Sequence, residues 1–458
     1  MAGLVEGRDK LEKQMLRYTL SEMDKMGELL KCEREVDPEY ELGGVLKHFR
    51  NKKPIVFNNV KGSKVKVAGG LYGDRKILYE LLHMNHENRL FKFMDAIANP
   101  KPYSVVNTGP VKENIIKENI DISKLFPIPK FQEKDSSSFI TAGVLVIKDP
   151  ETGKYFTSIR RFQINGGNEL SALIASSKLT NDFLELEKLN KDLEVAIILG
   201  YDAEFLMASQ IPSATYGVDK YEIDSALRGE ALELVSCETV DLLVPAYAEI
   251  VLEGRIVAGL RQMEGPFGEL MGYYGAKASH PVIKIDAITH RNNPIFQAAF
   301  PCREEHVSNG LIREVELYNS LRNQVDVVDV NVTEGGGYRF NAFASINKQK
   351  DGDGKSAILA ALGSNRDLKQ VVIVDEDVDI FDVQDIEWAI TTRSQASLDM
   401  VVVPGALGSS LEPSHDLRGV TDKVGIDATK PLGMEKFERA IIPGFENIDI
   451  NKYFPNLK

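Results

Sequence analysis

The chain has 458 residues, of which 43% are hydrophobic and 27% are charged, a composition typical of a globular protein with a sizeable core. This length exceeds one ordinary domain and predicts two or three. The 68 acidic and 55 basic residues give a net charge of −13. Such an excess of negative charge argues against a nucleic acid or an anionic membrane as the main partner.

The cysteines and the N-terminal residues indicate the compartment. Cys32, Cys237 and Cys302 lie far apart without a CxxC pair, which fits a reducing environment and gives no zinc motif. The N-terminal residues lack the apolar core of a secretory signal, and no run reaches the ~18 apolar residues of a membrane-spanning helix. We therefore expect a cytoplasmic protein without a membrane partner.

The first part of the chain alternates helical and extended patterns. The expected elements are helices at 8–31, 40–50 and 74–84 and strands at 54–60 and 64–73. This alternation predicts an α/β domain. Because residues 96–137 are rich in Pro, Asn, Asp and Ser, we place its boundary near residue 110, which gives an N-terminal domain of residues 1–110.

Strands dominate from about residue 138 to residue 300, with one expected helix near 170–189. Long β segments joined by glycine-rich turns predict a barrel or a curved sheet. The remaining chain returns to an α/β pattern. Its expected elements are buried strands at 325–333, 370–380 and 396–406 and helices at 355–364 and 383–393. The predicted domains are therefore residues 111–310 and 311–458, and the fold class is mixed α/β.

The stretch EGPFGEL, residues 264–270, holds two carboxylates within one turn. Its two glycines and its proline exclude a regular helix, so Glu264 and Glu269 need not share a helical face. Two carboxylates in one pocket can separate their pKa values, so that one stays ionised while the other holds a proton near neutral pH. The alternative is a surface turn with two solvated glutamates.

Two adjacent arginines lie in an apolar predicted strand, IRRFQI, at residues 159–164. Because side chains alternate across a strand, we expect one of Arg160 and Arg161 to face outward and the other to be buried or paired. A buried guanidinium binds carboxylates, and it could hold one glutamate ionised beside a protonated one. A structural ion pair between two strands is the alternative.

Weaker signals lie elsewhere. Lys423 precedes a glycine-containing turn in TDKVGIDAT, which suits a phosphate anchor, although a solvated lysine is the simpler interpretation. The seven histidines show no HExxH or other metal-binding spacing. The sequence by itself therefore predicts an acid/base site more strongly than a metal site.

Several long blocks of the sequence carry a resemblance to a known family. They are GELLKCEREVDPEYELGGVL near the N-terminus, ELVSCETVDLLVPAYAEIVLEG leading into EGPFGELMGYY, and VVIVDEDVDIFDVQDIEWAITTR and DKVGIDAT near the C-terminus. In these blocks the chain resembles the UbiD family of reversible decarboxylases, which use prenylated flavin mononucleotide (prenylated FMN). The resemblance implies a central split β-barrel that holds the flavin and a C-terminal α/β domain used for oligomerisation.

The family's acid/base network consists of one arginine and two glutamates beside the flavin. By motif matching these fall on Arg161, Glu264 and Glu269. Arg161 is preferred to Arg160 because in the family the arginine is followed by any residue, a glutamine and an aliphatic residue, as in RFQI. Glu269 then matches the proton donor and Glu264 the ionised partner of the arginine. Lys423 matches a lysine that contacts the flavin phosphate.

The chain departs from the family at the positions that bind a divalent metal beside the flavin phosphate. Where the family has Asn, His and Glu, this sequence has Phe156, Ser177 and Lys220. Since Mg²⁺ and Mn²⁺ prefer oxygen ligands, we expect the usual metal site to be absent. The Lys220 ammonium could replace the metal as counter-charge to the phosphate, with Ser177 also near the cofactor.

The resemblance leaves two hypotheses. In the first, the protein is a lyase, a decarboxylase or carboxylase acting on an aromatic or α,β-unsaturated acid through a prenylated flavin adduct. In the second, it is a non-catalytic subunit of a heteromeric carboxylase of the phenylphosphate carboxylase type. The retained Arg161, Glu264 and Glu269 favour the first, because an unused buried ion network is costly to desolvate. The resemblance also implies a flavin prenyltransferase as cofactor supplier and a homo-oligomer, dimer or hexamer.

Overall fold

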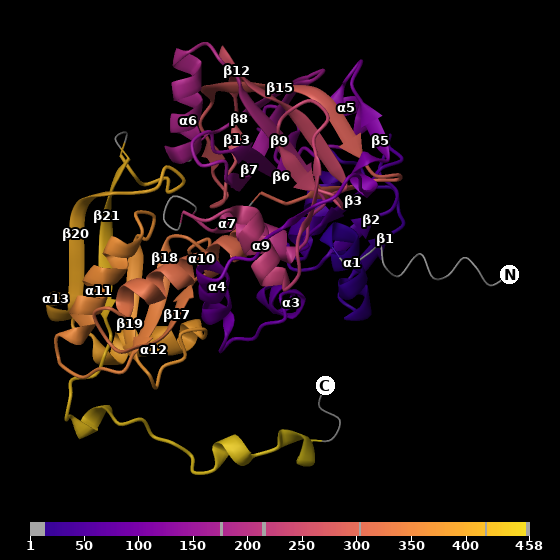
Figure 1. Ribbon diagram of the computed structural model, residues 1–458. Helices are drawn as coiled ribbons and strands as arrows, with labels where there is room; N and C mark the ends of the chain where they lie inside the picture. The colour runs from indigo at the N-terminus through magenta and orange to yellow at the C-terminus, as the bar shows by residue number, and fades with distance from the viewer. Residues whose placement is uncertain (1–13, 175–176, 213–216, 302–303, 417–418, 455–458) are drawn as a thin grey trace.

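The structure is a computed structural model that describes residues 14–174, 177–212, 217–301, 304–416 and 419–454. A barrel occupies the upper part of the molecule in Figure 1, and a five-stranded sheet with its helices lies below it. Helices α7, α9 and α10 lie between these two bodies. No helix within the described ranges is long and apolar enough to cross a membrane.

The barrel consists of six antiparallel strands. Their hydrogen-bonded order is β12–β9–β6–β7–β8–β15, and the additional pairing of β12 with β15 closes the ring. The strands are β6 (Phe139–Lys148), β7 (Tyr155–Gly166), β8 (Glu169–Ala172), β9 (Leu193–Leu199), β12 (Ile250–Glu264) and β15 (Ala278–His290). A short strand, β5 (Asn114–Ile116), extends β15 on its other side.

Both faces of the central barrel strands are buried, which explains their nearly continuous apolar sequences. In β6, Leu145 and Ile147 belong to one apolar cluster, while Val144 and Val146 belong to another. The second cluster includes residues of the surrounding helices, among them Phe205 of α7. Because alternate side chains of a strand point to opposite faces, one cluster fills the barrel and the other joins its wall to these helices.

The N-terminal residues form a small mixed sheet. Its order is β1 (Leu30–Cys32), β2 (Ile55–Phe57), β3 (Lys66–Gly69) and β16 (Ile295–Ala298), so the chain returns to this sheet after the barrel. The helices of this part are α1 (Met15–Lys25), α2 (Glu41–His48), α3 (Arg75–Leu81), α4 (Arg89–Ala98) and α5 (Ile122–Leu125). A second small sheet has the order β11 (Leu243–Pro245), β10 (Glu233–Ser236) and β4 (Ser104–Val105).

Further helices connect the barrel to the C-terminal sheet. They are α7 (Ala203–Gln210), α9 (Lys220–Arg228) and α10 (Glu304–Leu321), whereas α6 (Ser177–Lys188) packs on the barrel beside β12. The C-terminal sheet has the order β17 (Val327–Val332), β18 (Asn341–Ile346), β19 (Gln370–Asp375), β21 (Val420–Asp427) and β20 (Met400–Leu407). Its helices are α11 (Asp353–Ser364), α12 (Val383–Arg393) and α13 (Ala396–Asp399). The chain then leaves this sheet as an extended segment with short 3-10 turns (Figure 1).

The predicted fold class is confirmed, since the molecule is a mixed α/β structure with a closed central barrel and a C-terminal α/β sheet. Some local predictions were wrong. Residues 30 and 31 of the expected helix belong to β1, residues 396–399 of an expected strand form α13, and residues 420–427 form strand β21 and not a turn. The glycine there lies against helix α11, where a Cβ on Gly425 would meet Ile358 Cγ2 at 2.1 Å. The boundaries at residues 110 and 310 stay predictions, and residue 310 lies within α10.

Candidate active site

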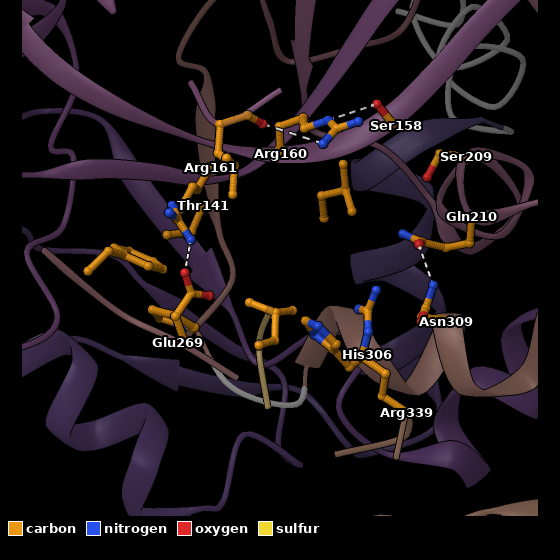
Figure 2. Close-up of a pocket in the computed structure, with 15 residues that line it drawn as sticks. Thr141, Ser158, Arg160, Arg161, Ser209, Gln210, Glu269, His306, Asn309 and Arg339 are labelled. Atoms are coloured by element: carbon orange, nitrogen blue, oxygen red, sulfur yellow. Dashed lines mark hydrogen bonds and ion pairs between the residues drawn. The ribbon is translucent and has the colours of Figure 1, made fainter. Parts of the chain in front are cut away.

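A cavity of about 300 Å³ lies where the barrel meets α7, α10 and the C-terminal part of the chain. Figure 2 shows polar side chains from all of these elements around one space. The lining residues are Thr141, Ser158, Ile159, Arg160, Arg161, Leu173, Ser209, Gln210, Phe267, Glu269, Pro301, His306, Asn309, Arg339 and Leu411. Two of the three predicted acid/base residues, Arg161 and Glu269, belong to this wall.

Arg161 on β7 binds both predicted glutamates. Its Nε donates to Glu264 Oε1 at 2.9 Å and its Nη2 donates to Glu264 Oε2 at 3.3 Å, while its Nη1 donates to Glu269 Oε1. The guanidinium also lies over the Phe267 ring, 4.8 Å from the ring centre. One arginine therefore fixes two carboxylates that come from the same turn.

The turn that carries the glutamates starts at the end of β12. Glu264 is the last residue of β12, a cis Gly265–Pro266 bond follows, and β13 (Phe267–Gly268) pairs with β14 (Tyr274–Gly275). Gly265 has a φ of +85°, a conformation that residues with a side chain rarely adopt. This geometry brings the Glu264 and Glu269 carboxylates to one guanidinium.

The two glutamates differ in how deeply they are buried. The Glu264 side chain is fully buried, and His280 Nε2 lies 3.5 Å from its Oε2. The Glu269 side chain is 16% exposed and faces the cavity. Burial raises the pKa of Glu269, the charge of Arg161 lowers it, and the neighbouring Glu264 raises it again, with a net shift upward. A turn of two solvated glutamates is therefore excluded, and Glu269 is suited to hold a proton.

Arg160 also lines the cavity, so the expectation that one of the two arginines faces outward was wrong. The register between β6 and β7 shifts between Ile140 and Gly143, directly opposite these arginines. Arg160 Nε donates to Ser158 Oγ at 3.2 Å and its Nη1 to the Leu173 carbonyl at 3.4 Å. Burial without a carboxylate partner among the described residues lowers the pKa of Arg160 to about 10.

Four further polar residues of the wall were missed by sequence reasoning. Gln210 at the end of α7 accepts a hydrogen bond from Asn309 Nδ2 at 3.3 Å, and its own Nε2 is buried without a partner in the described structure. Arg339 Nε donates to Asp367 at 2.9 Å, and His306 comes from the first turn of α10. These residues come from segments far apart in the chain, so no local pattern could have identified them.

Lys220 lies outside the cavity wall. It is 2% exposed, and its Nζ donates to the carbonyls of Ala208 at 3.1 Å, Ser209 at 3.4 Å and Ile211. These carbonyls form the C-terminal end of α7, which attracts positive charge. Burial lowers the Lys220 pKa to about 7, and its Nζ lies 5.7 Å from the centre of the Phe156 ring.

Lys423 is also not brought to the described cavity wall. Lys423 lies on β21, where its Nζ donates to the carbonyls of Leu362 and Asn365, each at 3.3 Å. Ser177 begins α6, but its side chain lies outside the described part of the structure. The cofactor-binding roles of Lys220, Lys423 and Ser177 stay predictions.

An arginine held between two glutamates beside a cavity is an arrangement suited to acid/base chemistry. The chain belongs to the UbiD family. The N-terminal, Rift-related and C-terminal domains described for 3-octaprenyl-4-hydroxybenzoate carboxy-lyase match residues 20–97, 104–304 and 306–428. The protein is therefore a decarboxylase, a carboxy-lyase, as the resemblance predicted.

Known relatives act on different acids. The chain is 38% identical over 421 residues to anhydromevalonate phosphate decarboxylase of Methanothermobacter thermautotrophicus, covering 91% of this chain and 98% of the relative. It is 31% identical over 447 residues to phenolic acid decarboxylase of Bacillus subtilis, covering 92% and 93%. Both named relatives are decarboxylases, and the alternative of a non-catalytic subunit has no support from them.

Solved structures place flavins in this fold. The UbiD-class enzyme HmfF from Pelotomaculum thermopropionicum in complex with FMN superposes with a TM-score of 0.93 at 42% identity, covering 96% of this chain and 99% of that one. An evolved dimeric form of the same enzyme, in complex with prenylated FMN, superposes with a TM-score of 0.89 at 40% identity, covering 96% and 100%. The flavin prediction is consistent with both complexes.

Proposed function

We propose that this protein is a prenylated-FMN-dependent decarboxylase of a small carboxylic acid, in which Arg161, Glu264 and Glu269 are the acid/base residues. The observation that carries the proposal is the contact of Arg161 with both glutamates at the wall of a cavity. The reaction consumes one proton and one carboxylate and yields CO₂ and a product with hydrogen on the same carbon. Glu269 is the residue that delivers this proton, because it faces the cavity and its pKa is raised.

Two donors in the cavity wall suit the phosphate of a flavin. Arg160 has no carboxylate partner in the described structure, and Gln210 Nε2 is a buried donor without an acceptor there. Both groups suit a bound oxyanion. When bound, the flavin supplies a sink for the electrons that CO₂ loss leaves on carbon.

The protein residues then have separate tasks. Glu264 is fully buried and stays close to Arg161, so it keeps the guanidinium in place. Arg161 in turn orients the Glu269 carboxyl toward the cavity. Among the described residues, no three His, Cys, Asp or Glu side chains lie close enough to hold a metal ion. The expectation of an absent metal site stays a prediction.

The substrate that we propose is an acid whose carboxyl group is attached to an unsaturated carbon, aromatic or not. Relatives named for anhydromevalonate phosphate and for phenolic acids support this breadth. We also propose that a flavin prenyltransferase supplies the cofactor. The test is CO₂ release by the protein co-produced with such an enzyme, from anhydromevalonate phosphate, gallate, vanillate and 3,4-dihydroxybenzoate. Release from none of these, with prenylated FMN bound, would argue against the proposed substrate class.

We propose further that the protein is a homo-oligomer, with residues 311–458 contributing to the interface. The segment after β21 runs along the outside of the molecule in Figure 1. Its apolar residues are strongly exposed in the single chain: Ile441 by 82%, Ile442 by 68% and Phe445 by 66%. Apolar exposure of this extent is typical of a protein interface. Size-exclusion chromatography with light scattering gives the number of subunits.

A further inference from the structure

The cavity wall contains a positively charged side chain, Arg160, that does not pair with the acid/base glutamates. Arg161 is paired with Glu264 and Glu269, whereas among the described residues Arg160, the next residue back along β7, has a hydroxyl and a carbonyl as its hydrogen-bond partners and no carboxylate. Burying a guanidinium without a counter-ion is costly, and it is tolerated where an anion binds. Arg160 retains partial exposure, and the surface that it presents belongs to the cavity wall.

A second donor in the same wall lacks an acceptor. Gln210 Nε2 is buried and has no hydrogen-bond partner within the described ranges, although Gln210 Oε1 accepts from Asn309. Figure 2 shows Arg160 and Gln210 at the wall of the same cavity, on the side away from Glu269. Two donors on different elements, β7 and α7, thus remain available to one oxyanion.

Two other basic residues near this side are already engaged: Arg339 of the cavity wall pairs with Asp367, and Lys220 lies behind the end of α7. Lys220 Nζ donates to three backbone carbonyls at the end of α7, and turning toward the cavity would break these hydrogen bonds. These carbonyls belong to residues that flank Gln210, so Lys220 holds the segment from which Gln210 reaches the cavity. Because Lys220 is held behind α7, Arg160 is better placed than Lys220 to pair with an anion on the cavity side away from Glu269.

We propose that Arg160, assisted by Gln210, binds an oxyanion in this cavity: the phosphate of the flavin, or an acidic group of the substrate other than the reacting carboxylate. The proposal rests on the proposed function only for the identity of these two ligands. A guanidinium binds phosphate and carboxylate through the same charge-assisted hydrogen bonds. Arg160 would thereby supply, without a metal ion, a positive charge that phosphate binding requires.

The test compares FMN with riboflavin, which lacks the phosphate, by flavin fluorescence titration of the full-length protein in buffer with a chelator. Variants are Arg160→Gln, Arg160→Lys and, as a control, Arg34→Gln at an exposed arginine. If the anion is the flavin phosphate, Arg160→Gln should bind FMN about 10- to 100-fold more weakly and bind riboflavin unchanged. Arg160→Lys should recover most of the affinity, which separates charge from misfolding.

The second arm measures turnover with anhydromevalonate phosphate, which carries a phosphate besides its carboxylate. If Arg160 binds the substrate, FMN affinity should stay unchanged and KM should rise about tenfold or more in Arg160→Gln. The proposal fails if FMN affinity and KM both stay within twofold of the Arg34→Gln control, or if FMN binds only after a divalent cation is added. Flavin titration needs no turnover. A protein that discriminates FMN from riboflavin but, loaded with prenylated FMN, releases no CO₂ from any of the four acids would therefore argue against the proposed function alone.

Discussion

Arg161 Nε lies 2.9 Å from Glu264 Oε1, and this contact joins strand β7 to the end of β12 at the wall of the cavity. The same guanidinium reaches Glu269, five residues further along the chain. Because Glu264 is fully buried and Glu269 is partly exposed, one arginine holds two carboxylates in different environments. Because their environments differ, one of two carboxyl groups can stay ionised while the other carries a proton.

Glu264→Gln should move the pH profile of decarboxylation to lower pH. Glu264 raises the pKa of Glu269, so removing its charge lets that pKa fall. Because Glu269 must be protonated to act as the acid, the rate is lost as pH rises through its pKa, and this loss should occur at lower pH in the variant. The measurement is kcat/KM between pH 5 and 9 with the flavin content matched. An unchanged or upward-shifted profile would contradict the assigned roles.

Lys220→Met should change the pH dependence of stability. Burial lowers the Lys220 pKa to about 7 in the folded protein, against 10.5 for the free side chain. Between these values the unfolded chain binds more protons at this site, so folded wild type gains stability with rising pH, by up to about 1.4 kcal/mol per unit. The variant lacks this contribution.

The measurement for Lys220 is urea unfolding of both proteins at pH 7, 8 and 9. The difference in free energy of unfolding, wild type minus Lys220→Met, should grow with pH. A difference independent of pH would mean that Lys220 titrates at its ordinary value. Since the Lys220 Nζ is also bound to carbonyls of α7, the variant is expected to be less stable at pH 9.

Gly425→Ala should destabilise the C-terminal sheet. The added Cβ would meet Ile358 Cγ2 at 2.1 Å, where β21 packs on α11. Overpacking of this kind costs about 1–3 kcal/mol, and the melting temperature should fall accordingly. Gly363→Ala is the matched control, since nothing lies within 4 Å of a Cβ there and alanine is the better helix former. Equal melting temperatures for the two variants would refute the packing role of Gly425.

Sequence patterns predicted the fold best where local signals are strong. Helix α12 has the predicted bounds, Val383–Arg393, and starts where the Asp382 carboxylate accepts a hydrogen bond from Gln384 N at 2.9 Å. Helix α7 was not predicted, because residues 203–209 are all buried and the helix has no polar face to give a periodic signal. Gly425 was interpreted as a turn residue, whereas the glycine serves close packing.

The site was predictable only in part, for a similar reason. Glu264 and Glu269 share a short motif whose glycines and proline require a turn, so their proximity could be inferred. Arg160 and Gln210 line one cavity only through the packing of β7 and α7, which no local pattern encodes. Arg160 was expected to face outward, but the surface that it presents is a wall of the cavity formed with distant segments. The sequence therefore predicted the pair of glutamates but not the oxyanion site that we propose at Arg160 and Gln210.

The most direct test of the central claim is solvent deuterium incorporation at the carbon that loses CO₂, measured by mass spectrometry on flavin-loaded wild type and Glu269→Gln. Glu269 is the proton donor in this account, so the variant should bind flavin normally while its turnover and exchange fall about 10²- to 10⁴-fold. Exchange at the wild-type rate in flavin-loaded Glu269→Gln would show that another group delivers the proton.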